Sequence, residues 1–193
     1  MDAKLLMQLR ERTGAPITSC QQVLAQTQGD VEKAAEILKK KGLEVVAKKA
    51  GREASEGLVD SYIHQNRKVG ALVQVVCETD FVARTVEFQD FVHELALQVT
   101  ASDPLYVGVD DIPADVLAKQ REQWMQEVAG LSKPPAIAEQ IVKGKLEKWF
   151  TEVCLLRQAF IKNEDMTVQE LLQEKIAKMG ENIKIRRFVR FCF

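Results

Sequence analysis

The chain has 193 residues, of which 46% are hydrophobic and 28% are charged, and its formal net charge is −1. This length and apolar content suit one domain, or a medium domain with a small appendage, around an ordinary hydrophobic core. No run approaches the ~18–20 uninterrupted apolar residues of a membrane-spanning helix, and the even spread of charged residues argues against disorder.

The N-terminal segment lacks the basic region, apolar core and small-residue cleavage site of a secretion signal. We therefore expect a mature, cytoplasmic protein, in a bacterial cytosol or an organelle matrix, with no membrane partner. The four cysteines are far apart and none has C-x-x-C spacing, which predicts neither a disulfide framework nor a zinc site. Cys192, close to the C-terminal end, could form a disulfide across a dimer.

Three short helices are expected in the N-terminal part of the chain. The first is capped by Asp2 and ends at Gly14, and the second begins at Pro16, whose missing N–H suits a first helical position. The third follows Asp30 and ends at the basic run 39–42. Each helix carries apolar residues at helical spacing, so the three should form a compact bundle.

A hinge is expected after this bundle, because two glycines flank a charged stretch there. The predicted organisation is a three-helix domain over residues 1–45, a hinge over 46–56 and a larger core and dimerisation domain over 57–193. Residues 1–52 carry a net charge of +4 and the remainder −5, a weak indication of partner docking.

The larger domain begins with two apolar runs, 58–64 and 68–77, whose short polar connection predicts a β-hairpin. The elements expected after it are a long amphipathic helix over 88–99, a helical hairpin whose two helices flank a Ser-Lys-Pro-Pro break at 132–135, an extended segment over 152–161, a helix over 167–178 and a closing strand over 180–191. The fold class is therefore α+β, with an antiparallel sheet of at least three strands backed by helices.

The sequence C-E-T-D-F-V-A-R at residues 77–84 marks a corner between the second strand and the following helix. Thr79 and Asp80 are residues whose side chains can accept hydrogen bonds from free N–H groups at a helix start. Phe81 follows the cap directly. Its ring can either fold back as a hydrophobic staple or stand out toward a partner, and the residues alone leave both possibilities open.

The T-D-F-V-A-R sequence of this corner resembles the signature of the elongation factor Ts family, the nucleotide exchange factors for elongation factor Tu. Two further segments match in the same order: R-x-x-T-G-A at residues 10–15, and G-E-N-I followed by R-R-F within 180–188. An L-L-x-Q-x-F match at 155–160 lies between them. The resemblance covers nearly the whole chain. It is to the short form, which has one copy of the core unit and pairs with itself.

The resemblance implies a ubiquitin-associated-like fold for the N-terminal bundle, elongation factor Tu as the partner, and a homodimer. It implies that the Asp80–Phe81 corner pushes into the GTPase and promotes GDP release by destabilising its magnesium and phosphate site. Ile17 lies off the apolar stripe of its own helix and is therefore a candidate exposed contact. The expected partner-binding residues are Thr79, Asp80, Phe81, Val82, Arg10, Arg12 and Ile17.

Enzymatic chemistry is not expected from this sequence. It contains no phosphate-binding glycine motif of the G-x-x-x-x-G-K-[ST] or G-x-G-x-x-G type, so the chain should hold no nucleotide itself. With only two histidines, a nucleophile–base pair or a metal-ligand cluster is hard to assemble. We therefore predict a protein that acts by binding, without a cofactor or a metal.

Two alternatives come from other functional classes. Residues 188–191 match the second half of an RNA-recognition strand motif, but the first half fails and the larger domain is acidic, so no direct nucleic-acid partner is expected. The basic run 39–41 is better explained as a favourable helix C-terminus. The bundle could instead bind ubiquitin. Salt dependence of oligonucleotide binding and titration with ubiquitin would distinguish these functions from nucleotide exchange.

Overall fold

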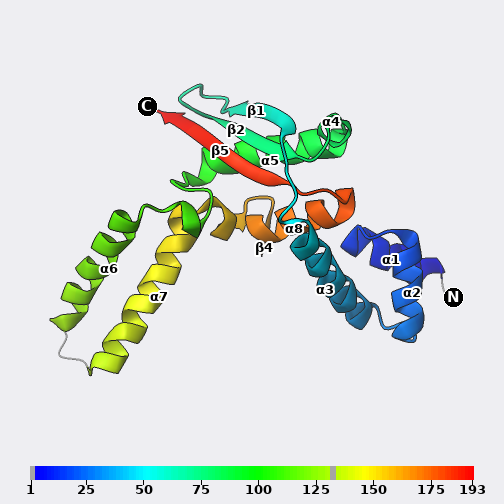
Figure 1. Ribbon diagram of the computed structural model, residues 1–193, viewed down its shortest axis with the longest axis horizontal. Helices are drawn as coiled ribbons and strands as arrows, with labels where there is room; N and C mark the ends of the chain where they lie inside the picture. The colour runs from blue at the N-terminus through cyan, green and yellow to red at the C-terminus, as the bar shows by residue number, and fades with distance from the viewer. Residues whose placement is uncertain (1–2, 131–133) are drawn as a thin grey trace. The chain divides into compact units, whose positions relative to one another are not determined.

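The computed structural model describes residues 3–130 and 134–193 (Figure 1). The chain divides into two compact units, here called the first and the second unit. The first unit comprises residues 1–58, 75–90 and 170–184, and the second comprises 59–74, 91–169 and 185–193. Asp2, Ser132 and Lys133, predicted as a helix cap and as part of a break, lie outside the described residues. The predicted division at residues 45 and 57 stays a prediction.

Helices and strands are mixed along the chain, which confirms the predicted α+β class. The helices are α1 (Ala3–Thr13), α2 (Ile17–Gln26), α3 (Val31–Lys49), α4 (Asp80–Ala83), α5 (Val86–Ser102), α6 (Ala114–Ala129), α7 (Pro135–Val153) and α8 (Val168–Met179), with 3-10 turns η1 (Val109–Asp111) and η2 (Leu155–Arg157). The strands are β1 (Glu56–Ile63), β2 (Val69–Cys77), β3 (Ala159–Phe160), β4 (Asn163–Thr167) and β5 (Lys184–Cys192).

The predicted three-helix bundle is confirmed, because α1, α2 and α3 pack against one another in the first unit (Figure 1). Its fully buried side chains come from all three helices and include Leu9, Cys20, Val23 and Leu24. Asp30 caps α3 by accepting from the Lys33 N–H at 3.1 Å. This core is small, so the bundle depends on close packing of few side chains.

The predicted end of the third helix is wrong. Helix α3 does not stop at residues 39–42 but continues to Lys49, so the predicted hinge begins inside a helix. A helical glycine costs about 1 kcal/mol relative to alanine, which a packed helix tolerates. A Cβ added at Gly42 would lie 3.5 Å from the Ala177 Cβ of α8, an ordinary van der Waals distance, so the packing there does not require a glycine.

A three-stranded sheet has the order β1-β2-β5, and β3 pairs with β4 in a separate antiparallel hairpin. The β2–β5 pairing is antiparallel: the Phe193 N–H donates to the Lys68 carbonyl at 3.1 Å, while Arg187 Nε donates to the Gln74 side chain at 2.9 Å. The sheet of at least three strands is therefore confirmed. The single extended segment predicted over 152–161 is wrong, because α7 continues to Val153 and η2 precedes the two-residue β3.

Two buried glutamines tie the segment around β3 to helix α5 in the second unit. Gln98 accepts from the Ile161 N–H at 2.8 Å and donates to the Ala159 carbonyl at 3.1 Å. Gln158 donates to the Glu152 carbonyl at 2.9 Å and to that of Ser102 at 3.3 Å. These side-chain amides bind backbone groups at the ends of α5 and α7 and in and beside β3, which gives the glutamine of L-L-x-Q-x-F a structural role.

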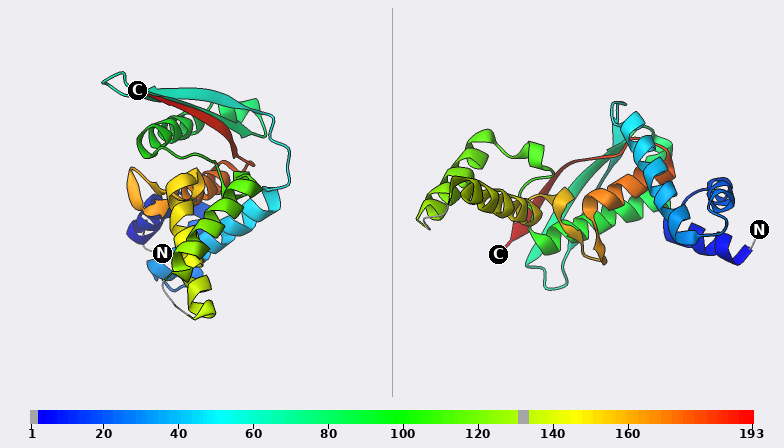
Figure 2. Two further views of the ribbon diagram at one scale, coloured as in Figure 1. Left: turned by 90° about the vertical axis from the view of Figure 1, so that its left-hand side faces the viewer. Right: turned by 90° about the horizontal axis from the view of Figure 1, so that it is seen from below.

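The predicted helical hairpin is confirmed as α6 and α7, which pack along each other (Figure 2). Trp124 and Trp149 meet edge to face across it, with ring centroids 6.0 Å apart. Within the described ranges, no helix has both the length and the apolar character needed to cross a membrane.

Gly57 provides a test of the local geometry of the first unit. Its φ is +141°, and an added Cβ would lie 2.1 Å from the Val75 carbonyl oxygen. We expect Gly57→Ala to lower the free energy of unfolding by roughly 2–4 kcal/mol, because backbone strain and a backbone clash combine. Gly51→Ala is the matched control, since no atom lies within 4 Å of its added Cβ. Equal denaturant midpoints for the two variants would contradict this description.

Candidate functional site

The corner after β2 is a capped single turn of helix. Thr79 has extended backbone angles (φ −129°, ψ 154°) and is the N-cap of α4, accepting from the Val82 N–H at 3.4 Å. Asp80, the first residue of α4, pairs with Arg84 at 2.9 Å. The predicted capping chemistry is therefore provided by Thr79, whereas the Asp80 carboxylate lies in an exposed ion pair.

The Phe81 side chain stands out from this turn. It is 81% exposed, whereas Ala83 on the same turn is buried. Of the two possibilities left open by the sequence, the hydrophobic staple is therefore wrong. Val82 is partly buried. An exposed phenyl ring on a fixed turn is a suitable shape for insertion into a pocket of another protein.

The backbone before the turn is held by residues that follow α8. The Glu181 carboxylate accepts from the N–H groups of Glu78 and Thr79, both at 3.1 Å, and from the Thr79 hydroxyl at 2.6 Å. In the other direction, Glu78 accepts from the Asn182 N–H at 2.6 Å and from Arg52 at 3.3 Å. We call these five residues the clamp.

Sequence reasoning missed the clamp as a functional feature, because it matched residues 180–188 only as a family segment and a strand. Glu181 and Asn182 are separated from the corner by about a hundred residues, so no local pattern links them. The available signal was the pair of polar residues between a helix-ending glycine and an apolar strand. Asn182 is only 2% exposed, and a buried amide requires partners.

Two ionisable groups of the corner have shifted pKa values. Hydrogen bonding from the Asn182 N–H, together with Arg52, lowers the pKa of Glu78, which is therefore ionised at neutral pH. Burial, followed by the nearby charge of Glu181, raises the pKa of Cys77 to about 11. The Cys77 thiol is thus protonated and donates to the Thr79 carbonyl at 3.2 Å, so it is structural rather than nucleophilic.

The predicted contact residues of the bundle are also accessible. Arg10 is exposed, and Ile17 is 43% exposed, as its position off the apolar stripe predicts. Arg12 makes a bidentate ion pair with Glu32, in which Nη2 of Arg12 lies 2.8 Å from Oε2 of Glu32. Arg12 is therefore already paired within the chain, and a partner would have to share it or compete with Glu32.

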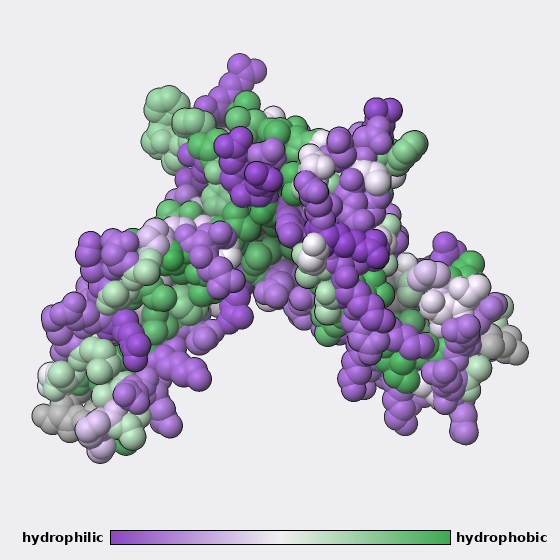
Figure 3. Space-filling model, in the orientation of Figure 1, coloured by the Kyte–Doolittle hydropathy of each residue, from purple (hydrophilic) through white to green (hydrophobic). Residues whose placement is uncertain are grey.

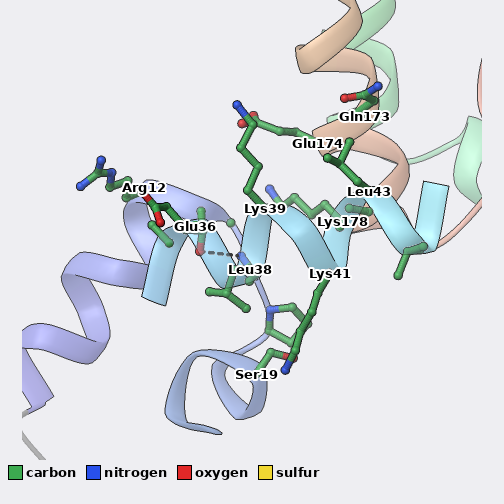
Figure 4. A pocket seen from close by; sticks show the side chains of 18 of the residues that line it. Arg12, Ser19, Glu36, Leu38, Lys39, Lys41, Leu43, Gln173, Glu174 and Lys178 are labelled. Carbon is green, nitrogen blue, oxygen red and sulfur yellow. Dashed lines mark hydrogen bonds between the residues drawn. The ribbon is translucent and has the colours of Figure 1, made fainter. Parts of the chain in front are cut away.

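A cavity of about 520 Å³ adjoins this part of the bundle (Figure 4). Its lining comes from the end of α1, the following loop, α2, α3 and α8, and it includes Lys39, Lys41 and Lys178 as well as Glu36 and Glu174. Charges of both signs line it, so it selects neither anions nor cations.

Helix α8 connects this cavity with the start of α5. Lys178, which lines the cavity, and Lys175 both pair with Glu87, at 2.5 and 3.3 Å. Burial opposes ionisation of Glu87, but the hydrogen bonds and charges of the two lysines prevail and lower its pKa. The corner, the clamp and the bundle thus all belong to the first unit.

These groups are arranged for binding. In the part of the chain that the structure describes, no three His, Cys, Asp or Glu side chains are grouped as a metal site would require. The exposed features are an aromatic ring on a capped turn and an apolar side chain with arginines on the bundle. Such features can bind a protein surface.

Comparison with known proteins identifies the family. The family model described as "Elongation factor TS" matches residues 11–191. The chain belongs to the elongation factor Ts family. The match includes the corner, the clamp, the helical hairpin and most of the closing strand, so the recognition made from three short segments is confirmed.

Several bacterial relatives named elongation factor Ts are similar over almost the whole chain. The protein from Moorella thermoacetica is 54% identical over 95% of this chain and 90% of its own length. That from Carboxydothermus hydrogenoformans is 52% identical over 98% of this chain and 87% of its own length. A relative from Anaeromyxobacter dehalogenans is 49% identical over 99% of this chain and 87% of its own length. Family membership places the chain among the translation elongation factors.

Proposed function

We propose that this protein is a guanine nucleotide exchange factor for elongation factor Tu and promotes GDP release in the cytosol during translation elongation. The observation that carries the proposal is the 81% exposure of Phe81 on a capped and clamped corner of a family member. An exchange factor forms and breaks no covalent bond. This agrees with a site made of an aromatic ring, short polar side chains and arginines.

The mechanism follows from linkage. A protein that weakens GDP binding to the GTPase by some factor must itself bind the GDP-loaded form more weakly by the same factor. Phe81 inserts into the GTPase at a position that is open only when the nucleotide site is disturbed. The Asp80 carboxylate, which is partly exposed beside the ring, disturbs the groups of the GTPase that hold the magnesium ion and the phosphates.

Phe81 cannot supply all the energy required. Burying one phenylalanine side chain contributes roughly 1.5–3 kcal/mol, which shifts an equilibrium but does not displace a tight ligand. The remainder comes from docking of Thr79 and Val82 beside the ring and of Arg10, Arg12 and Ile17 on the bundle. Two separate contact regions in one unit make the insertion an intramolecular step once the bundle has docked.

An RNA-binding function receives less support. Two arginines of the strand that resembles half of an RNA-recognition motif are engaged within the chain: Arg187 donates to Gln74, and Arg190 donates to the Thr100 carbonyl at 3.0 Å and pairs with Asp103 at 3.1 Å. Basic side chains occupied in this way are less available to phosphates.

We further propose that the protein forms a homodimer through the sheet. In the second unit, α5 lies along one face of the strands, where Thr100 and Arg190 meet, and no other described segment of this unit covers the opposite face (Figure 2). Hydrophobic atoms gather over the strands in Figure 3. The exposed apolar side chains of the strands are Val59, Ile63, Leu72, Val189 and Phe191.

A second copy of the chain fits this face best. A flat apolar surface made of one patch is self-complementary under two-fold symmetry, and packing two such sheets buries both at once. A monomer would leave a contiguous hydrophobic patch in water, which soluble proteins seldom do. The dimer would also present two corners to the partner.

Removal of the Phe81 ring tests the exchange proposal. We expect the intact protein to accelerate release of a fluorescent GDP analogue from elongation factor Tu, and Phe81→Ala to lose most of that acceleration, by roughly tenfold or more, because the inserted side chain is gone. Leu105→Ala, which removes another exposed apolar side chain, should leave the rate unchanged. Full activity in Phe81→Ala would place the driving contact elsewhere.

Charge on the sheet face tests the dimer. Leu72→Lys and Phe191→Lys should each convert a dimer of about twice the chain mass into a monomer in sedimentation equilibrium, because a lysine would be buried without a partner. Leu105→Lys adds the same charge at an exposed position off the sheet and should stay dimeric. A wild-type protein that sediments as a monomer would refute this second proposal.

A further inference from the structure

We propose that Glu181 is a positioning residue that fixes the direction in which Phe81 points, through its bonds to the backbone of Glu78 and Thr79. This inference rests on the proposed exchange function and adds a residue that does not itself touch the partner in the mechanism above. Its basis is the set of hydrogen bonds in the clamp.

The corner cannot hold this direction by itself. Helix α4 has a single turn, Asp80–Ala83, and one turn of helix is unstable without external contacts. The N-cap bond from the Val82 N–H to the Thr79 side chain is 3.4 Å, long for a hydrogen bond. The exposed Phe81 ring has little of the chain around it to restrain it. The orientation of the turn must therefore be set by the residues before it.

Glu181 restrains those residues directly. One of its carboxylate oxygens accepts from both N–H groups, of Glu78 and Thr79, and the other accepts from the Thr79 hydroxyl. Hydrogen bonds to a charged acceptor are stronger than neutral ones. Two adjacent peptide planes bound to one carboxylate cannot rotate independently, so the chain direction at Thr79, and with it the start of α4, is fixed.

The second half of the clamp holds Glu181 in place. Glu78 accepts from the Asn182 N–H at 2.6 Å, and the buried Asn182 amide donates to the Arg52 carbonyl at 2.6 Å. Gly180, with φ of +72°, turns the chain out of α8 just before Glu181. Three segments that are distant in sequence thus meet at the base of the corner, and each restrains the others.

The exchange assay tests this role with substitutions of graded character. Glu181→Ala removes every acceptor, and we expect the maximal rate of GDP release to fall about tenfold while the half-saturating concentration changes less, because docking of the bundle is intact. Glu181→Gln should retain most of the rate, since its amide oxygen can accept from both N–H groups while its NH₂ meets the Thr79 hydroxyl. Glu164→Ala, on an exposed residue of β4, is the control.

A double substitution separates positioning of Phe81 from general weakening of the fold. If Glu181 acts through the ring, Glu181→Ala should have almost no further effect on the rate in a Phe81→Ala background. If Glu181→Ala does not fold, Glu181→Asp replaces it. Asp keeps the charge but moves the carboxylate back, so it should be slower than Gln.

Amide hydrogen exchange provides a readout that needs no partner. In the free protein, exchange at Glu78 and Thr79 should be about tenfold faster in Glu181→Ala than in the wild type, and close to wild type in Glu181→Gln. The positioning role would be overturned if Glu181→Ala showed a wild-type rate of GDP release together with unchanged amide hydrogen exchange. It would also be overturned if Glu181→Asp released GDP faster than Glu181→Gln. Either result would leave the nucleotide exchange function standing. If the intact protein does not accelerate GDP release from elongation factor Tu, the function and the positioning role both fail.

Discussion

The exposed Phe81 ring sets the main requirement on the first unit. Folding an aromatic side chain back onto the protein lowers the free energy, because its apolar surface leaves water. A one-turn helix has too little stability of its own to prevent this. The opposing interaction is the carboxylate of Glu181, which binds two consecutive backbone N–H groups at 3.1 Å and so defines where α4 begins. Glu181 is in turn held in position by helix α8, which precedes it, and by the buried Asn182, which follows it.

The same unit connects the corner with the bundle. The segment after α3 contacts the clamp through Arg52, and α8 contacts Glu87, at the start of α5, through Lys175 and Lys178. Because the proposed partner-binding groups belong to one compact unit, binding energy from docking of the bundle would help to drive the proposed insertion at the corner. The second unit contributes the exposed sheet face, through which we propose that two chains pair.

Much of this could be predicted because the signals are local. The apolar run of β2, a capping Thr79 and the helical spacing after it are all readable within about twenty residues, and the corner was found from them. The bundle was found in the same way. The sequence misplaces the end of α3, because a glycine after three lysines is typical of a helix end, whereas in the fold α3 runs through Gly42 to Lys49.

What could not be predicted depends on partners distant in sequence. Whether Phe81 folds back or stands out depends on the hydrogen bonds that Glu181 makes to the residues before α4, and the sequence alone leaves both possibilities open. The clamp joins residues 52, 78 and 181, for which no spacing rule exists. Gln158 was visible as a motif position, but its buried bonds to Glu152 and Ser102 required the fold.

The proposed exchange function requires that this protein binds the nucleotide-free GTPase in preference to the GDP-bound form, and that the corner causes this preference. Titration calorimetry of the intact protein with elongation factor Tu, once free of nucleotide and once saturated with GDP, measures the preference. We expect much tighter binding to the nucleotide-free form, with a ratio of affinities equal to the factor by which the protein weakens GDP binding, and a ratio closer to one for Phe81→Ala. Equal affinity of the intact protein for both forms would contradict it, because a ligand without such a preference cannot drive exchange.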